Sequence, residues 1–274
     1  MRCGDRRGVA LIFVLWLLVL LGVIVAEVVS QARTEAQILS SLRARIVARY
    51  SAESGILAAT TRIEALLDST RSQPERITAL RNLDSLLTSL NDLDLGSGRF
   101  AVAVVDLNAR IDLNRADGAT LQGLFQQFTT NQRAEEVVTR LQQAPINRLG
   151  EISNIPGISD SLALSVAPYV TVWSDGLVNV NSASERVLAA LPGVSDATVR
   201  SVVRRRETGE VFFTTTGLFG PSHTPALRLT AMPSRLMIIG RGWQDGHPLT
   251  HEIQAVYAVA GTRLVLLAWQ ERDL

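Results

Sequence analysis

The sequence predicts an α+β fold: a long N-terminal helix packed on a small antiparallel sheet, with a large helical segment inserted into that sheet. Three observations support this prediction. An apolar run that begins at Val9 continues into a proline-free segment that extends to Leu67. Apolar residues alternate around Phe100 and again within residues 217–274, which favours strands at both places. Residues 112–216 lie between them and contain short helical patterns with Pro-Gly turns.

The apolar run is long enough to cross a membrane. From Val9 to Ala26 the chain has no charged or amide side chain, and about 20 apolar helical residues span a hydrocarbon core of roughly 30 Å. Three arginines precede the run, namely Arg2, Arg6 and Arg7. Basic residues beside a first span keep that end in the cytoplasm. We therefore expect residues 9–29 to form a single transmembrane segment, with the body on the far side.

Three interpretations of this segment are open. A secretory signal peptide has a shorter apolar run, about 7–15 residues, before a small-x-small cleavage site, which Ser30-Gln31-Ala32 would supply. A plain signal anchor is the second. The third rests on Arg6-Arg7-Gly8-Val9, where a basic leader ends in glycine directly before the apolar helix. That junction resembles the class III signal of type IV pilins and of the pseudopilins of type II secretion.

This resemblance implies that residues 1–8 are a cytoplasmic leader, which prepilin peptidase removes by cutting between Gly8 and Val9. Most members of the family carry glutamate at the fifth mature position, where this chain has Phe13. That glutamate is thought to pair with the N-terminal amine of a neighbouring subunit, and such a contact is strong at low dielectric. Its absence is typical of minor pseudopilin K, which sits at the tip. A better fit to lipid is the simpler explanation of Phe13.

The helix is expected to continue through residues 30–67 in the periplasm. Apolar residues recur there at helical spacing, which predicts one face packed on the body. They are Ile38, Leu42, Ile46, Tyr50, Leu57, Ile63 and Leu67.

Residues 68–111 are predicted to form the first part of the body. Pro74 opens one more helical piece, and a strand runs from Phe100 through Asp106 and Asn108 toward Ile111. The leucine and isoleucine residues at helical spacing in that piece are Ile77, Leu80, Leu83, Leu86, Leu87 and Leu90.

The inserted domain, residues 112–216, contains two imperfect copies of a helix-hairpin-helix-like unit. Asp112 and Asp160 are predicted helix caps, and Asn181 or Ser182 is expected to form a capping arrangement with Glu185. One stretch also matches a short motif of minor pseudopilin K, NxNxA followed by LPG. The matching residues are Asn179, Asn181, Ala183, Leu191, Pro192 and Gly193.

The rival interpretation is a membrane-anchored periplasmic DNA-binding protein of the competence type. Its helix-hairpin-helix would be residues 179–206, and a group of arginines there would suit a phosphate backbone. However, both hairpins lack their second glycine, and Asp160 and Asp196 stand where phosphate would approach. The sequence therefore favours no nucleic acid partner. The arginines concerned are Arg200, Arg204, Arg205 and Arg206.

Composition and motifs argue against an enzyme. The net charge is +1 and the single cysteine, Cys3, lies in the expected leader, so the body has no thiol chemistry. No phosphate-binding loop, nucleophile elbow or zinc motif occurs, which predicts no small-molecule substrate. His247 and His251 are four apart, but Pro248 opposes a shared helix, and surface histidines are the expected outcome. His223 stands alone.

No cofactor is expected from motifs, although the resemblance implies calcium. Calcium requires several oxygen ligands, and no loop motif assigns them. The available carboxylates are Asp175, Asp245, Glu252 and Asp273.

Taken as a whole, the resemblance implies a minor pseudopilin at the tip of the type II secretion pseudopilus. Such a subunit initiates or caps pseudopilus assembly and so enables export of folded periplasmic proteins across the outer membrane. The implied partners are minor pseudopilins I and J, other pseudopilins and prepilin peptidase. The implied location is the bacterial inner membrane, with a cytoplasmic N-terminus and a periplasmic body.

Overall fold

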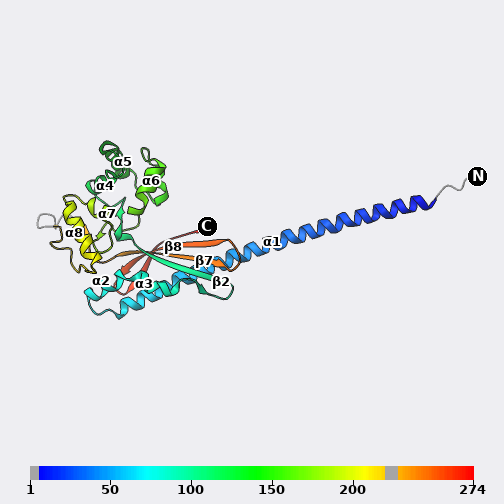
Figure 1. The fold of residues 1–274 in the computed structure, drawn as a ribbon, viewed down its shortest axis with the longest axis horizontal. Helices are drawn as coiled ribbons and strands as arrows, with labels where there is room; N and C mark the ends of the chain where they lie inside the picture. Colours follow the sequence, from blue (N-terminus) through cyan, green and yellow to red (C-terminus); the bar gives the residue numbers. More distant parts are fainter. Residues whose placement is uncertain (1–5, 220–227) are drawn as a thin grey trace, which may run out of the picture.

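The computed structural model describes residues 6–219 and 228–274. Helix α1 (Arg6–Ser69) dominates it, and its N-terminal half extends alone from the body (Figure 1). Within Leu11–Ser69, an 18-residue window has a mean hydropathy of 2.9 and none of it is buried by the rest of the chain. The length, apolar composition and exposure of this half fit a membrane anchor. Figure 1 also shows the sheet and a separate group of helices, so the predicted α+β fold is confirmed.

The sheet has five strands in the order β1-β2-β7-β8-β9, and all neighbours are antiparallel. Strands β2 (Gly98–Asp106) and β7 (Arg235–Gln244) are neighbours although far apart in sequence. The predicted pairing of a strand near Phe100 with the C-terminal strands is therefore confirmed. The remaining strands are β1 (Leu93–Asp94), β8 (Thr250–Ala260) and β9 (Arg263–Asp273).

The C-terminal half of α1 lies on one face of this sheet, but not by the predicted side. Ile63 and Leu67 are buried as expected, whereas the apolar residues before them are half or more exposed. The face that meets the sheet is instead mostly alanine. The exposed residues are Ile38, Leu42, Ile46, Tyr50 and Leu57, and the buried ones include Ala44, Ala48, Ala52, Ile56 and Ala59.

Two glycines of β7 explain why small residues face the sheet. A Cβ on Gly240 would lie 2.7 Å from the Ala52 carbonyl oxygen, and one on Gly242 would lie 2.1 Å from that of Ala48. The helix backbone thus rests directly on the strand, at a distance that only small residues on both sides permit. Hydrophobic periodicity in α1 alone could not reveal this, because the space is made by a distant strand.

Charged side chains join α1 to the edge strand β9. Arg45 pairs with Asp273 at 3.1 Å and Arg49 with Glu271 at 3.2 Å. The ring nitrogens of His251 lie 2.7 Å from Asp273 and 3.2 Å from Glu271. His251 is only 7% exposed, so the expectation of a surface histidine is wrong for this residue. The two carboxylates of β9 supply partners for both nitrogens of this buried ring on β8.

Between α1 and β1 the chain forms α2 (Gln73–Arg81), α3 (Leu83–Leu87) and the 3-10 turn η1 (Thr88–Leu90) rather than one helical piece. Ser72 caps α2 by accepting a hydrogen bond from the Glu75 amide, and Pro74 occupies the first turn as expected. The apolar residues of these elements pack on α1 and the sheet. Those that are buried are Ile77, Leu80, Leu83, Leu87 and Leu90.

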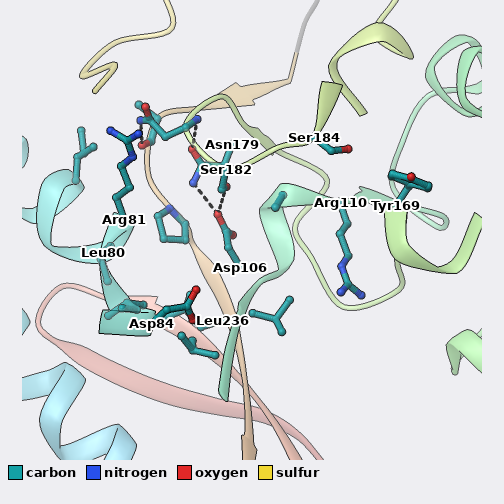
Figure 2. A pocket seen from close by; sticks show the side chains of 18 of the residues that line it. Leu80, Arg81, Asp84, Asp106, Arg110, Tyr169, Asn179, Ser182, Ser184 and Leu236 are labelled. Carbon is teal, nitrogen blue, oxygen red and sulfur yellow. Dashed lines mark hydrogen bonds between the residues drawn. The ribbon is translucent and has the colours of Figure 1, made fainter. Parts of the chain in front are cut away.

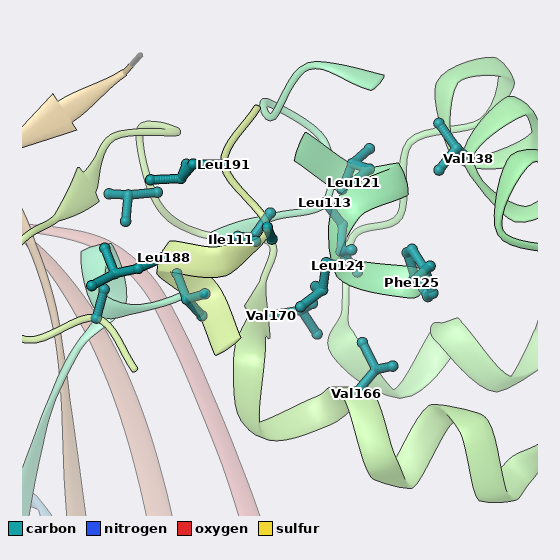
Figure 3. Packing of buried hydrophobic residues seen from close by; sticks show 14 of the residues in the cluster. Ile111, Leu113, Leu121, Leu124, Phe125, Val138, Val166, Val170, Leu188 and Leu191 are labelled. Atoms are coloured by element: carbon teal, nitrogen blue, oxygen red, sulfur yellow. The ribbon is translucent and has the colours of Figure 1, made fainter. Parts of the chain in front are cut away.

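The chain between β2 and β7 forms a second hydrophobic core of its own (Figure 3). Its longer helices are α4 (Gly118–Phe125), α5 (Asn131–Gln143) and α8 (Asp196–Glu207). The shorter helical elements are η2 (Leu107–Ala109), η3 (Leu149–Asn154), α6 (Asp160–Val166), η4 (Ala167–Tyr169) and α7 (Glu185–Ala189). Two parallel pairs of short strands complete it: β3 (Ile111–Asp112) with β4 (Val170–Thr171), and β5 (Val178–Asn179) with β6 (Leu229–Thr230).

Three predicted helix caps are wrong. The residues that cap α4, α6 and α7 are Asp117, Ser159 and Ser184, and not Asp112, Asp160 and Asn181 or Ser182. Each of the true caps is extended and accepts a hydrogen bond from an amide three residues later. Asp112 and Asn181 are buried instead, where they bind backbone groups of other segments.

Candidate functional site

In the structure the inserted domain is wider than the expected residues 112–216, because its core also includes Ile111, Leu229 and Ala231. From here on the name denotes the whole chain between β2 and β7.

The inserted domain leaves the sheet at a single end. Asp106, the last residue of β2, pairs with Leu236 of β7, and Gly98 at the other end of β2 pairs with Gln244. A Cβ on Gly98 would meet Ser51 of α1, and farther along both elements a Cβ on Gly55 of α1 would meet Phe100 of β2, so β2 runs in the same sense as α1. The chain between Asp106 and Leu236 therefore projects from the end of the sheet opposite the free half of α1, as Figure 1 shows.

Asp106 is the central residue of the junction between sheet and inserted domain. Its carboxylate accepts hydrogen bonds from the Asn179 amide at 2.7 Å and from the Ser182 hydroxyl (Figure 2). It also accepts one from the Asn108 backbone N–H at 2.8 Å. Burial raises the pKa of Asp106, although these hydrogen bonds oppose the effect. Two residues of the NVNS segment therefore bind the end of β2.

Asn108 makes a second set of hydrogen bonds at the same junction. Its amide donates to Asp175 at 2.7 Å and to the Leu177 carbonyl at 2.9 Å. The oxygen of its side-chain amide (Oδ1) accepts hydrogen bonds from the backbone N–H groups of Ser234 and Arg235, each at 2.9 Å. Sequence analysis placed Asp106 and Asn108 in a strand and missed both roles, because their partners lie far along the chain.

Asn181 connects three segments inside the inserted domain. Its side-chain nitrogen donates to the Phe212 carbonyl at 2.7 Å and to the Ala231 carbonyl at 2.8 Å, while its oxygen accepts from the Phe212 amide at 2.9 Å. The side chain is 8% exposed. Burying a polar group costs free energy unless it is paired, and here one asparagine side chain pairs with the Phe212 amide and with the carbonyls of Phe212 and Ala231.

The rest of the motif shapes the α7–α8 hairpin. Ala183 and Leu191 are buried, and Gly193 has a φ of 75°, which favours glycine after Pro192. Gly123 of α4 lies against the same hairpin, since a Cβ there would be 2.5 Å from the Ala190 carbonyl oxygen. Four of the six motif residues are buried in the inserted domain, namely Asn179, Asn181, Ala183 and Leu191. Pro192 is partly exposed and Gly193 is exposed, in the turn between α7 and α8.

The expected processing site and Phe13 lie elsewhere, in α1. Gly8 and Val9 belong to its first turns, and Phe13 is 72% exposed. The exposed apolar residues continue past the anchor half, since Ile38, Leu42 and Ile46 are 54%, 50% and 55% exposed. They recur at four-residue spacing and form one face, which we call the outer stripe. It is a suitable surface for another helix.

The arginines of α8 are partly committed to internal contacts. Arg206 donates to the carbonyls of Val180 and Ala183 at 3.1 and 2.7 Å, and burial lowers its pKa. Arg205 pairs with Glu210 at 2.7 Å. The Arg206 guanidinium holds α8 to the motif segment, and the Arg205 guanidinium is paired with a carboxylate just beyond the end of α8. These two groups are therefore not arranged as a phosphate-binding row.

Each of the four carboxylates considered for calcium already has a polar or cationic partner within the protein. Asp175 accepts from Asn108 and Ser234, and Asp245 pairs with Arg99. Glu252 is held by Arg241 and Arg272 at 2.7 Å each, and Asp273 by Arg45 and His251. Among the described residues, acidic and histidine side chains form no group of three or more suited to a metal ion. His223 lies outside the described residues.

A long helix that extends beyond an antiparallel sheet, with its C-terminal half packed on that sheet, defines a pilin-type α+β fold. No family model and no curated protein matches the sequence. The structure is similar to a chain in the crystal structure of the GspK-GspI-GspJ complex from the enterotoxigenic Escherichia coli Type 2 Secretion System. The TM-score is 0.62 at 15% identity, over 88% of this chain and 99% of that chain. The expected pilin-type fold is therefore confirmed as one that this protein shares with a chain of that complex.

Proposed function

We propose that this protein is a minor pseudopilin at the tip of a type II secretion pseudopilus, where it initiates or caps assembly and so enables export of folded proteins. It acts as a structural component, not as an enzyme. The observation that carries the proposal is the position of the inserted domain, which projects from the end of the sheet opposite the anchor half of α1. A further subunit stacked above would meet this domain.

The anchor and the outer stripe support the same function. In this proposal, residues 9–29 hold the N-terminus in the cytoplasm and place the body in the periplasm, since arginines flank the span on that side. The outer stripe, Ile38, Leu42 and Ile46, then continues beyond the membrane and remains half exposed. We propose that it packs against the corresponding helices of minor pseudopilins I and J. The similar solved structure is a complex of GspK with proteins of those names.

The competence-type DNA-binding protein is less well supported. Its binding surface would need several arginines free to reach phosphates. Arg205 and Arg206 instead make short contacts within the inserted domain. We therefore propose that nucleic acid is not a partner of this protein.

Site-specific crosslinking tests the tip position. Cysteine at Ile46 should crosslink to the two partner minor pseudopilins, because the outer stripe is the uncovered helix face. Cysteine at Leu164, which is 75% exposed on the inserted domain, is the matched control and should give no such product. Deleting the whole chain should abolish or deregulate secretion. Repeated self-crosslinks between copies through position 46 would place the protein along the shaft and contradict the proposal.

Processing gives a second, independent prediction. Gly8→Asp should block removal of residues 1–8, because the peptidase is expected to approach the backbone closely at a residue without a side chain. Intact mass of the purified protein checks this: the native chain should begin at Val9 and the variant at Met1. Gly22→Asp is not a suitable control, since it charges the membrane span, whereas Arg2→Gln changes only the leader and should still be cut. A native chain that begins at Arg33 would instead indicate a secretory signal peptide.

A further inference from the structure

A cavity of about 500 Å³ lies between α2, the end of β2 and the base of the inserted domain (Figure 2). That volume is within the range of roughly 300–1,000 Å³ typical of sites for small ligands. One part of its wall is apolar, and another carries polar and charged side chains. The apolar residues include Ile77, Leu80, Val104, Pro233 and Leu236.

Arg110 enters this cavity without a partner. Its backbone is extended, with φ −124° and ψ 158°, and the next residue, Ile111, is buried in the core of the inserted domain. Side chains alternate along extended backbone, so Arg110 points to the opposite side, where it lines the cavity. Within the part of the chain that the structure describes, its guanidinium makes no hydrogen bond or ion pair. Burial lowers the pKa of Arg110, as expected for a cation that has lost water without gaining a counter-ion.

Tyr169 stands beside Arg110 because two short strands are paired. Strand β3 pairs in parallel with β4, Ile111 opposite Val170, so the residues that precede them are neighbours at the cavity wall. The Tyr169 ring is held 5.6 Å from that of Phe128, and its side chain lines the cavity. An aromatic ring and a guanidinium therefore lie near each other on the wall of the cavity.

The other charges of the wall do not neutralise Arg110. Asp106 is occupied by Asn179, Ser182 and the Asn108 amide. Arg81 donates to the backbone carbonyls of Arg206, Gly209 and Glu210. Asp84 is exposed on α3 and forms no ion pair with Arg110.

We propose that this cavity binds a carboxylate attached to an apolar body, as at the C-terminus of a polypeptide or in a small organic acid. One planar guanidinium offers a two-pronged donor that matches a carboxylate. A doubly charged phosphate would be repelled by Asp84 and Asp106 more strongly than a carboxylate, which carries one charge. The apolar wall receives the remainder of the ligand. The proposal does not depend on the secretion role.

Calorimetric titration of the full chain in non-ionic detergent tests the site. The probes are acetyl-Ala-Leu-Phe with a free carboxylate, the same peptide as its amide, 3-phenylpropionate and inorganic phosphate. The free-acid peptide should bind with a Kd below about 1 mM, and the amide about tenfold more weakly. Tighter binding of the peptide than of 3-phenylpropionate would identify a polypeptide C-terminus as the source, and equal binding a small acid. Equal binding of acid and amide, preference for phosphate, or no binding at about 1 mM would each overturn the proposal.

Three variants locate the binding. Arg110→Gln should weaken free-acid binding about tenfold, and Arg204→Gln, which changes an exposed arginine of α8, should leave it unchanged. Asp84→Asn should strengthen binding, because it removes a negative charge from the wall. Arg110 makes no internal contact in the described residues, so Arg110→Gln should melt at or above the native temperature. A lower melting temperature, or unaltered binding by this variant, would show that the guanidinium has a structural role instead.

Discussion

Gly242→Ala should separate α1 from the sheet and destabilise the body by about 3 kcal/mol or more. The added Cβ would lie 2.1 Å from the Ala48 carbonyl oxygen and 2.4 Å from the Ala52 amide nitrogen. Both atoms belong to the backbone of α1, so no side-chain rotation can relieve the contact. Either the helix moves outward or β7 bends, and in both cases the packing of the alanine face is lost.

Denaturant unfolding of the full chain in non-ionic detergent, followed by near-ultraviolet circular dichroism, measures this loss. Trp243 lies next to the substitution in β7 and contributes to this signal together with Trp16, Trp173 and Trp269. Gly150→Ala is the matched control, because a Cβ there meets nothing within 4 Å. A midpoint for Gly242→Ala that equals the native one would mean that α1 lies farther from β7 than described.

The close contact of α1 with β7 also shows where sequence reasoning about α1 succeeds and fails. The absence of proline and the continuous apolar run predicted one helix to Leu67, and α1 ends at Ser69. The same apolar pattern predicted the wrong buried face, because the prediction assigned the largest apolar side chains to the interior. Glycines at 240 and 242 make alanine the residue that fits. The large residues remain exposed, which suits a helix that packs on other subunits.

The capping errors have a related cause. Asp112, Asn181 and Ser182 have suitable side chains for an N-cap and precede helical patterns. They were unavailable because each binds a distant group: Asp112 accepts from the Ser174 amide, Asn181 binds Phe212, and Ser182 binds Asp106. Local sequence contains no information on those partners. A serine or aspartate a few residues away caps the helix instead.

The candidate site was predictable only in its location. The NxNxA and LPG pattern marked residues 179–193, which the structure places at the base of the inserted domain. Nothing in the sequence indicated that Asp106 and Asn108 form the other side of the junction, because it showed only an acidic and an amide residue at the end of a predicted strand. Their function follows from the pairing of β2 with β7, which brings both ends of the inserted domain together.

Asn181→Leu should cost roughly 3 kcal/mol of stability, the second largest effect that we expect. Leucine has a similar size but cannot replace any hydrogen bond, so the Phe212 amide and the carbonyls of Phe212 and Ala231 lose their partner. Each buried backbone group left unpaired costs about 1–3 kcal/mol, and partial access of water reduces the sum. Equilibrium unfolding of the full chain measures the total.

Hydrogen exchange distinguishes this loss from general unfolding. Asn181 ties the segments at Phe212 and Ala231 to the motif, so exchange should accelerate first at the Phe212 amide and around β6. The sheet, whose core is formed separately with α1, should keep its protection. Asn154→Leu, at an exposed asparagine, should change neither measurement. Equal loss of protection in β7 and β8 would contradict the view that Asn181 acts within the inserted domain. It would indicate that the sheet and the inserted domain unfold together as one cooperative unit.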